Sequence, residues 1–231
     1  MKPVLLLVPG MLNDARIWSE VARKLDDVAE VLVAHVTTQS SLVDMAQDAW
    51  RLVDSHPVGT PLVLAGFSMG GYVVMEMLQQ SFRPLHGVAL LSTSPRPESP
   101  DGMAVRQKTI EAMQTDFHKV VEGILKWSTY KPSEALTQDL RQMMLDLGSE
   151  VAIRQTQAIM ARRDHRAMLA RLTCPVHLLC GQWDRVTPTE LIQELSNLIP
   201  HAPCQIVENS GHMLPRENAD QVAYHLRQIL V

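Results

Sequence analysis

The sequence predicts an α/β fold with a mainly parallel sheet and helices on both faces. Short apolar runs of strand length alternate with stretches in which apolar residues recur at helical spacing. The apolar runs end at turns rich in glycine, proline, serine or asparagine. This alternation is typical of parallel strands joined by crossover helices. With 231 residues, the chain can bury the core of one large domain of this kind.

Four strands are predicted in the first part of the chain. Residues 4–8 form an uninterrupted apolar run, which is typical of a strand covered on both faces. Further strands are predicted within 28–36, 61–65 and 85–92. Their order, interleaved with helices, predicts a βαβαβαβ arrangement.

A helix with apolar residues on one face is expected after each of the first three strands. Asn13 or Asp14 can cap the first helix, and Ser40 or Ser41 can cap the second. The third helix begins directly after the turn at Gly66.

The strand pattern is absent from about residue 95 to residue 171. Stretches near 102–127, 133–147 and 149–168 show helical spacing instead. We expect these helices to form an inserted lid over the strand ends. Six of the 13 methionines lie in it, namely Met103, Met113, Met143, Met144, Met160 and Met168. Their flexible side chains would suit loosely specified apolar ligands, or would fill gaps in the core.

The sheet pattern resumes after the lid. Residues 174–181 form another apolar run, followed by a predicted helix near 189–198. Residues 203–208 form the last predicted strand, and a helix ends the chain. Internal repeats and linkers are absent from the sequence. We therefore expect a single domain, 1–231, with the lid inserted at about 95–171.

The clearest functional motif in the sequence is the turn Gly66-Phe67-Ser68-Met69-Gly70. It fits the G-x-S-x-G pattern between a strand and a helix, which holds a serine on a sharp turn. The two glycines would let strand and helix pass closely. The hydroxyl of Ser68 would then lie near free N–H groups at a helix start. The alternative is a glycine-rich turn with an idle serine.

An acid and a base follow two later strands. Asp184 lies just after the strand predicted at 174–181, and His212 follows the last strand in Ser-Gly-His-Met. The carboxyl ends of parallel strands share one edge of a sheet, so these residues and Ser68 should meet there. Serine needs an imidazole to take its proton, and the imidazole needs a carboxylate to orient it. Asp164, in the lid, is the rival acid.

Composition narrows the function classes. The formal net charge is −4, and the basic residues are scattered, so nucleic acid is not an expected partner. The N-terminal apolar run of about five residues is too short for a signal sequence or a membrane span. Cys174, Cys180 and Cys204 lack metal-ligand spacing and are expected to be buried free thiols. These observations predict a cytoplasmic protein that does not bind membranes.

Throughout its length, the chain resembles enzymes of the α/β-hydrolase fold. Within that superfamily it is similar to compact bacterial esterases that resemble the pimeloyl-carrier-protein methyl ester esterases and the menaquinone-pathway cyclohexadiene synthases. The matching segments are Leu7-Val8-Pro9-Gly10, Gly66-Phe67-Ser68-Met69-Gly70-Gly71, Gly181-Gln182-Trp183-Asp184-Arg185-Val186-Thr187-Pro188, and Gly211-His212 with Glu217. In two respects the chain departs from the pattern: Pro9 stands where many relatives have His, and the usual leading β-hairpin is missing.

The resemblance implies six parallel strands in the order 2-1-3-4-5-6. It also implies an oxyanion hole formed by the backbone N–H groups of Met69 and Met11, with Leu12 as the alternative to Met11. Ser68, Asp184 and His212 would be the catalytic residues.

The expected reaction is hydrolysis of a small-molecule carboxylic ester with a small or medium acyl group, without a metal or an organic cofactor. A lyase, a C–C hydrolase or a perhydrolase on the same scaffold is an alternative. A ligand-binding receptor that turns over slowly is another. We expect a monomer or a small homo-oligomer.

Overall fold

A six-stranded parallel sheet forms the centre of the computed structural model, which describes residues 2–80 and 83–231. The strand order is β2-β1-β3-β4-β5-β6, as predicted. The strands are β1 (Val4–Val8), β2 (Glu30–Val33), β3 (Leu62–Phe67), β4 (Gly87–Leu91), β5 (Val176–Gly181) and β6 (Cys204–Val207). The edge strand β2 lies within the predicted stretch 28–36 and pairs with β1 alone, over four residues.

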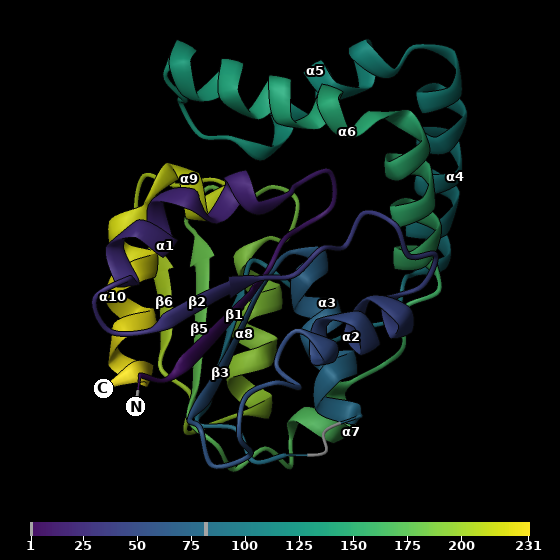
Figure 1. Cartoon of the computed structure of the whole chain (residues 1–231). Helices are drawn as coiled ribbons and strands as arrows, with labels where there is room; N and C mark the ends of the chain where they lie inside the picture. The colour runs from purple at the N-terminus through teal and green to yellow at the C-terminus, as the bar shows by residue number, and fades with distance from the viewer. Residues whose placement is uncertain (1, 81–82) are drawn as a thin grey trace.

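Helices cover both faces of the sheet (Figure 1). The helices of the described residues are η1 (Ala15–Trp18), α1 (Ser19–Leu25), α2 (Leu42–Arg51), α3 (Met69–Gln79), α4 (Pro100–Thr115), α5 (Phe117–Ser128), α6 (Glu134–Met160), α7 (Arg166–Leu169), α8 (Thr189–Leu198), α9 (Leu214–Glu217) and α10 (Ala219–Leu230). Of the predicted caps, Asp14 accepts from the backbone N–H of Arg16, and Ser41 accepts from that of Asp44.

The sheet separates two apolar cores. In β1, Leu5 and Leu7 belong to the core under α1 and α10, whereas Leu6 and Val8 belong to the core under α2, α3 and α8. Strand side chains alternate between faces, so a continuous apolar run supplies both cores at once. This explains why the central strands contain almost no polar residues.

The segment between β4 and β5 is helical, as predicted, but its boundaries differ. The stretch 102–127 forms two helices because Asp116 leaves the helical conformation and caps α5 through the N–H of Lys119. Gly148, at the boundary expected between the stretches 133–147 and 149–168, adopts a non-helical φ of 82° and ψ of 169°, so α6 consists of two helical segments joined by a kink. Figure 1 shows α4, α5 and α6 apart from the sheet, on the side where the strands end.

The three cysteines are free, with Cys180 buried and the other two partly buried. In the part of the chain that the structure describes, no helix is both long enough and apolar enough to cross a membrane.

Candidate active site

Ser68 occupies the sharp turn between β3 and α3 with a positive φ of 53° and ψ of −117°. Such a conformation costs a non-glycine residue of the order of 1–3 kcal/mol. Two hydrogen bonds hold it: the Ser68 N–H donates to the Leu91 carbonyl at 2.9 Å, and the Thr93 hydroxyl donates to the Ser68 carbonyl at 2.9 Å. The turn is therefore fixed on both sides of the serine.

Glycines make this turn possible by letting backbones meet. A Cβ added to Gly66 would lie 2.4 Å from the Gly70 carbonyl oxygen. A Cβ added to Gly70 would lie 2.1 Å from the carbonyl oxygen of Val8 in β1. Both distances are well below van der Waals contact, so the glycines of the motif meet a steric requirement.

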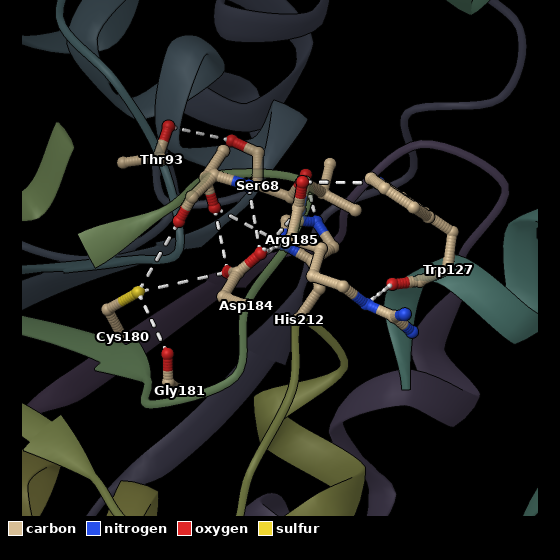
Figure 2. Close-up of polar contacts among 10 residues, drawn as sticks. Ser68, Thr93, Trp127, Cys180, Gly181, Asp184, Arg185 and His212 are labelled. Atoms are coloured by element: carbon tan, nitrogen blue, oxygen red, sulfur yellow. Dashed lines mark hydrogen bonds and ion pairs between the residues drawn. The ribbon is translucent and has the colours of Figure 1, made fainter. Parts of the chain in front are cut away.

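Ser68, His212 and Asp184 form one hydrogen-bonded chain (Figure 2). His212 Nε2 lies 2.9 Å from Ser68 Oγ, and His212 Nδ1 lies 2.8 Å from Asp184 Oδ2. A carboxylate can only accept, so Nδ1 carries the proton and Nε2 presents its lone pair to the serine hydroxyl. The three side chains, predicted from separate strand ends, are together in the geometry that proton removal from Ser68 requires.

Asp184 is a buried carboxylate with its lone pairs occupied. The N–H groups of Val186 and Thr187 donate to Oδ1 at 2.9 and 2.8 Å, and the Thr187 hydroxyl donates to Oδ2 at 2.8 Å. Burial raises the pKa of the Asp184 carboxyl, but the charge of His212 and the hydrogen bonds from His212 and Thr187 outweigh this, so the pKa is lowered. The carboxylate therefore stays charged and keeps His212 in one orientation.

The loop that carries His212 is attached to the end of α5. The N–H of His212 donates to the Ser128 carbonyl at 2.7 Å. Glu217, which the sequence analysis noted beside His212, accepts from the N–H of Tyr130 at 2.7 Å. Burial raises the pKa of the Glu217 carboxyl. The helices after β4 thus take part in positioning His212.

A second attachment joins the Asp184 loop to the same helix. Arg185 Nε donates to the Trp127 carbonyl at 3.0 Å, and Trp127 Nε1 donates back to the Arg185 carbonyl at 3.1 Å (Figure 2). The guanidinium also lies 4.9 Å from the centre of the Trp127 ring. No local motif marks this pair, because the two residues are 58 positions apart.

The two amides expected to form the oxyanion hole are unengaged. Within residues 2–80 and 83–231, the N–H groups of Met11 and Met69 have no hydrogen-bond acceptor. The alternative donor, Leu12, is occupied: its N–H donates to the buried Gln155 Oε1 at 2.8 Å. This geometry favours Met11 over Leu12 as the donor from the first loop.

A cavity of about 610 Å³ opens beside the serine, with Ser68, His212 and Met11 in its wall. Apolar side chains from the helices between β4 and β5, including Ile124 and Trp127, line it. The six methionines in the insertion do not: none belongs to this wall, and Met113, Met143 and Met144 are fully or almost fully buried in the core. Met113, Met143 and Met144 therefore fit the alternative expectation, that these methionines fill gaps in the core.

The cavity wall also contains charges that the sequence analysis missed. Glu98, Arg106 and Arg162 lie in it, all from the segment between β4 and β5. In the sequence, charged residues in a helical segment are most simply interpreted as its solvent-exposed face, so nothing marked these three as cavity residues.

Asp164 is not part of the site. It forms an ion pair with Arg166 at 2.5 Å and is largely exposed. Among the described residues, no three His, Cys, Asp or Glu side chains gather as they would to hold a metal ion.

Comparison with known proteins shows the family of this chain. The chain matches the alpha/beta hydrolase family over residues 5–223. It belongs to that family. Its six-stranded parallel sheet with helices has the α/β-hydrolase fold, and the chain is an enzyme of that superfamily.

Relatives of this alpha/beta hydrolase differ in their reactions. A 2-succinyl-6-hydroxy-2,4-cyclohexadiene-1-carboxylate synthase from Salmonella paratyphi C is 25% identical over 242 residues, covering 99% of this chain and 94% of the relative. A thermophilic esterase from Thermogutta terrifontis has a TM-score of 0.87 at 24% identity, covering 100% of this chain and 91% of the other. MenH from S. aureus has a TM-score of 0.84 at 19% identity, with coverages of 99% and 93%. These identities establish the fold and leave the reaction open.

Proposed function

We propose that this alpha/beta hydrolase is a carboxylic ester hydrolase that works through an acyl-enzyme on Ser68. The observation that carries the proposal is the unbroken chain from Ser68 Oγ through His212 to Asp184, with the serine in the wall of a cavity. Two unengaged amides, those of Met11 and Met69, flank the same turn. These groups support the proposal because ester hydrolysis through an acyl-enzyme needs a nucleophile, a base and donors for an oxyanion.

In the first half of the reaction, Ser68 Oγ attacks the ester carbonyl carbon while His212 Nε2 takes the hydroxyl proton. The Met11 and Met69 amides donate to the resulting oxyanion, an interaction worth about 2.7–4 kcal/mol per donor. The tetrahedral adduct then collapses, and the alcohol leaves with the proton from His212. The acyl group remains bonded to Ser68 Oγ.

In the second half, water attacks the acyl carbon while His212 Nε2 takes a proton from it. The bond to Ser68 breaks, and the serine recovers its proton from His212. The carboxylic acid leaves, and the enzyme is restored. Asp184 stabilises the imidazolium in both halves without being protonated itself.

A lyase is the second candidate, favoured by the cyclohexadiene synthase that aligns with 99% of this chain. In that reaction type His212 and Ser68 would remove a proton from substrate, and no acyl group would be held. Hydrolysis has the stronger support from the two free amides, which suit an oxyanion formed at the serine-bound carbon.

A panel of p-nitrophenyl esters of increasing acyl length, with methyl esters and thioesters, tests the proposal. We expect many turnovers per protein and an optimum at short or medium acyl groups, with kcat/KM rising up to about fourfold per methylene until the cavity is full. A burst of one product per protein followed by silence would identify a receptor. Failure to cleave any member of the panel by folded protein would remove the esterase assignment.

A further inference from the structure

The cavity wall beside the serine carries more positive than negative charge. Its charged residues include Arg96, Glu98, Arg106 and Arg162. Arg96 is matched from outside the wall by Glu194, whose Oε2 accepts from Arg96 Nε at 2.7 Å. The other two arginines share the single carboxylate of Glu98.

Glu98 lies between the two guanidiniums and is almost buried. Arg162 Nη1 donates to Glu98 Oε2 at 2.5 Å, and Arg106 Nε donates to the same oxygen. Burial raises the pKa of the Glu98 carboxyl, but Arg162 and Arg106 lower it to about 2. Glu98 is therefore charged at neutral pH, and this three-residue cluster keeps one net positive charge.

The two arginines differ in the donors that they have left. Arg162 is fixed in the wall: its Nε donates to the Arg96 carbonyl at 2.9 Å, and its guanidinium lies 4.9 Å from the centre of the Tyr72 ring. Arg106 donates through Nε to Glu98 and, within the described residues, through no other atom. Its side chain is 28% exposed, against 9% for Arg162. Two terminal amino groups of Arg106 are thus available to a ligand in the cavity.

This cluster lies close to the serine. Tyr72 follows Ser68 by four residues on α3, so its side chain lies one helical turn away, and Arg162 stacks on it. A ligand that reaches from Ser68 to the cluster therefore needs a short spacer. A planar guanidinium with paired N–H groups matches a carboxylate better than any neutral group.

We propose that Arg106, oriented by Glu98 and backed by Arg162, binds a carboxylate of the substrate, so that the preferred substrates are esters that also carry a free carboxylate. The proposal rests on the ester hydrolysis proposed above and defines its substrate class. A net charge of one in the cluster corresponds to one carboxylate.

The test compares monoethyl esters of straight-chain dicarboxylic acids with analogues in which a carboxamide replaces the free carboxylate. The two series have nearly the same shape and differ in charge. We expect kcat/KM of the wild type to favour the acid over the amide by at least about tenfold at the best chain length, because charge-assisted hydrogen bonds contribute about 1.5–3 kcal/mol. A ratio near one at every length would overturn the proposal.

Variants then locate the effect. Arg106→Gln should bring the ratio of acid to amide close to one, and Arg106→Lys should leave an intermediate ratio. Arg141→Gln is the matched control, because Arg141 pairs with Glu122 in the neighbouring helices and lies outside the cavity wall. The control should keep the wild-type ratio. A preference for the acid that survives in Arg106→Gln would place the carboxylate elsewhere and contradict the assignment.

Binding without cleavage separates this inference from the proposed function. N-ethyl monoamides of the same acids replace the ester and keep the carboxylate, and N-ethyl diamides lack the charge. The monoamides should raise the Tm of the wild type at lower concentration than the diamides, and this difference should vanish in Arg106→Gln. This result would support the subsite even if no ester were cleaved. Equal shifts from both ligands would reject it even if neutral esters were hydrolysed rapidly.

Discussion

Ser68 shows how a strained residue becomes a positioned one. Its φ of 53° is unfavourable for a residue with a Cβ. The hydrogen bond to the Leu91 carbonyl and the close approach of Gly66 to Gly70 hold the backbone in this conformation. The same turn sends Oγ towards His212, at 2.9 Å, and starts α3 at the next residue. The strained conformation therefore accompanies a fixed position of the Ser68 hydroxyl beside His212.

Asp184 provides a test at the same scale. Asp184→Asn keeps the shape of the side chain but places an amide against His212 Nδ1, which favours the wrong tautomer. We expect kcat to fall by at least about a hundredfold with little loss of stability, measured as steady-state ester hydrolysis and as thermal unfolding. Asp164→Asn is the matched control and should stay within about twofold of wild type, since that acid pairs with Arg166 at the surface. The reverse pattern would move the acid of the triad into the inserted helices.

Helix α6 helps to hold the loop after β1 that contains Met11 and Leu12. Gln155 is fully buried, accepts from the Leu12 N–H at 2.8 Å and donates through Nε2 to the Val36 carbonyl at 2.8 Å. Leu12 itself has a positive φ of 55°, so this bond holds a strained residue in place. The hydroxyl oxygen of the next residue, Thr156, lies 3.5 Å from the Met11 sulfur. An inserted helix therefore fixes the loop that presents the Met11 amide.

Gln155→Ala should loosen that loop. The Leu12 N–H and the Val36 carbonyl would lose their partner, at a cost to stability of about 1–3 kcal/mol. If the Met11 amide stabilises the transition state, kcat should fall about tenfold or more while KM changes little. The exposed neighbour Gln157→Ala is the control for helix propensity. Loss of stability with an unchanged kcat would show that Gln155 is structural alone.

The ion pairs of Glu98 with Arg106 and Arg162 should make the free energy of unfolding of the protein depend on pH. The Glu98 pKa is about 2 in the folded protein against an ordinary value of 4.5, so the unfolded chain takes up this proton first as the pH falls. The stabilisation is complete above about pH 4.5 and is lost as the pH falls towards 2. Glu98→Gln should therefore lower the free energy of unfolding in urea by about 1–3 kcal/mol at neutral pH, and the gap to wild type should narrow below about pH 4.5. A gap that does not change with pH would mean that shape rather than charge matters at this position.

Local pattern was enough to predict the strands and to single out Ser68, Asp184 and His212 as side chains that would meet, whereas the strand order came from the family resemblance. Each of the strand runs is followed by its turn within the same short stretch, and Ser68, Asp184 and His212 all follow strand ends, so topology brings them together. Gln155 could not be found in this way because its partner Leu12 is 143 positions away. The same holds for Arg162, whose partner Glu98 is 64 positions away. The positions of Gln155 and Arg162 depend on packing between segments that are far apart in the sequence, which local spacing does not reveal.

The proposed ester hydrolysis requires a covalent bond between the acyl group and Ser68. Rapid-quench mass spectrometry of the wild type with an activated ester measures that bond directly. Within the first turnover, we expect a mass increase equal to the acyl group, located on the peptide that contains Ser68, which then decays as acid is released. The matched variant Ser68→Ala should show no increase and less than about a hundredth of wild-type turnover. Multiple turnovers without acyl mass on Ser68, or with the acyl group on another residue, would contradict the account.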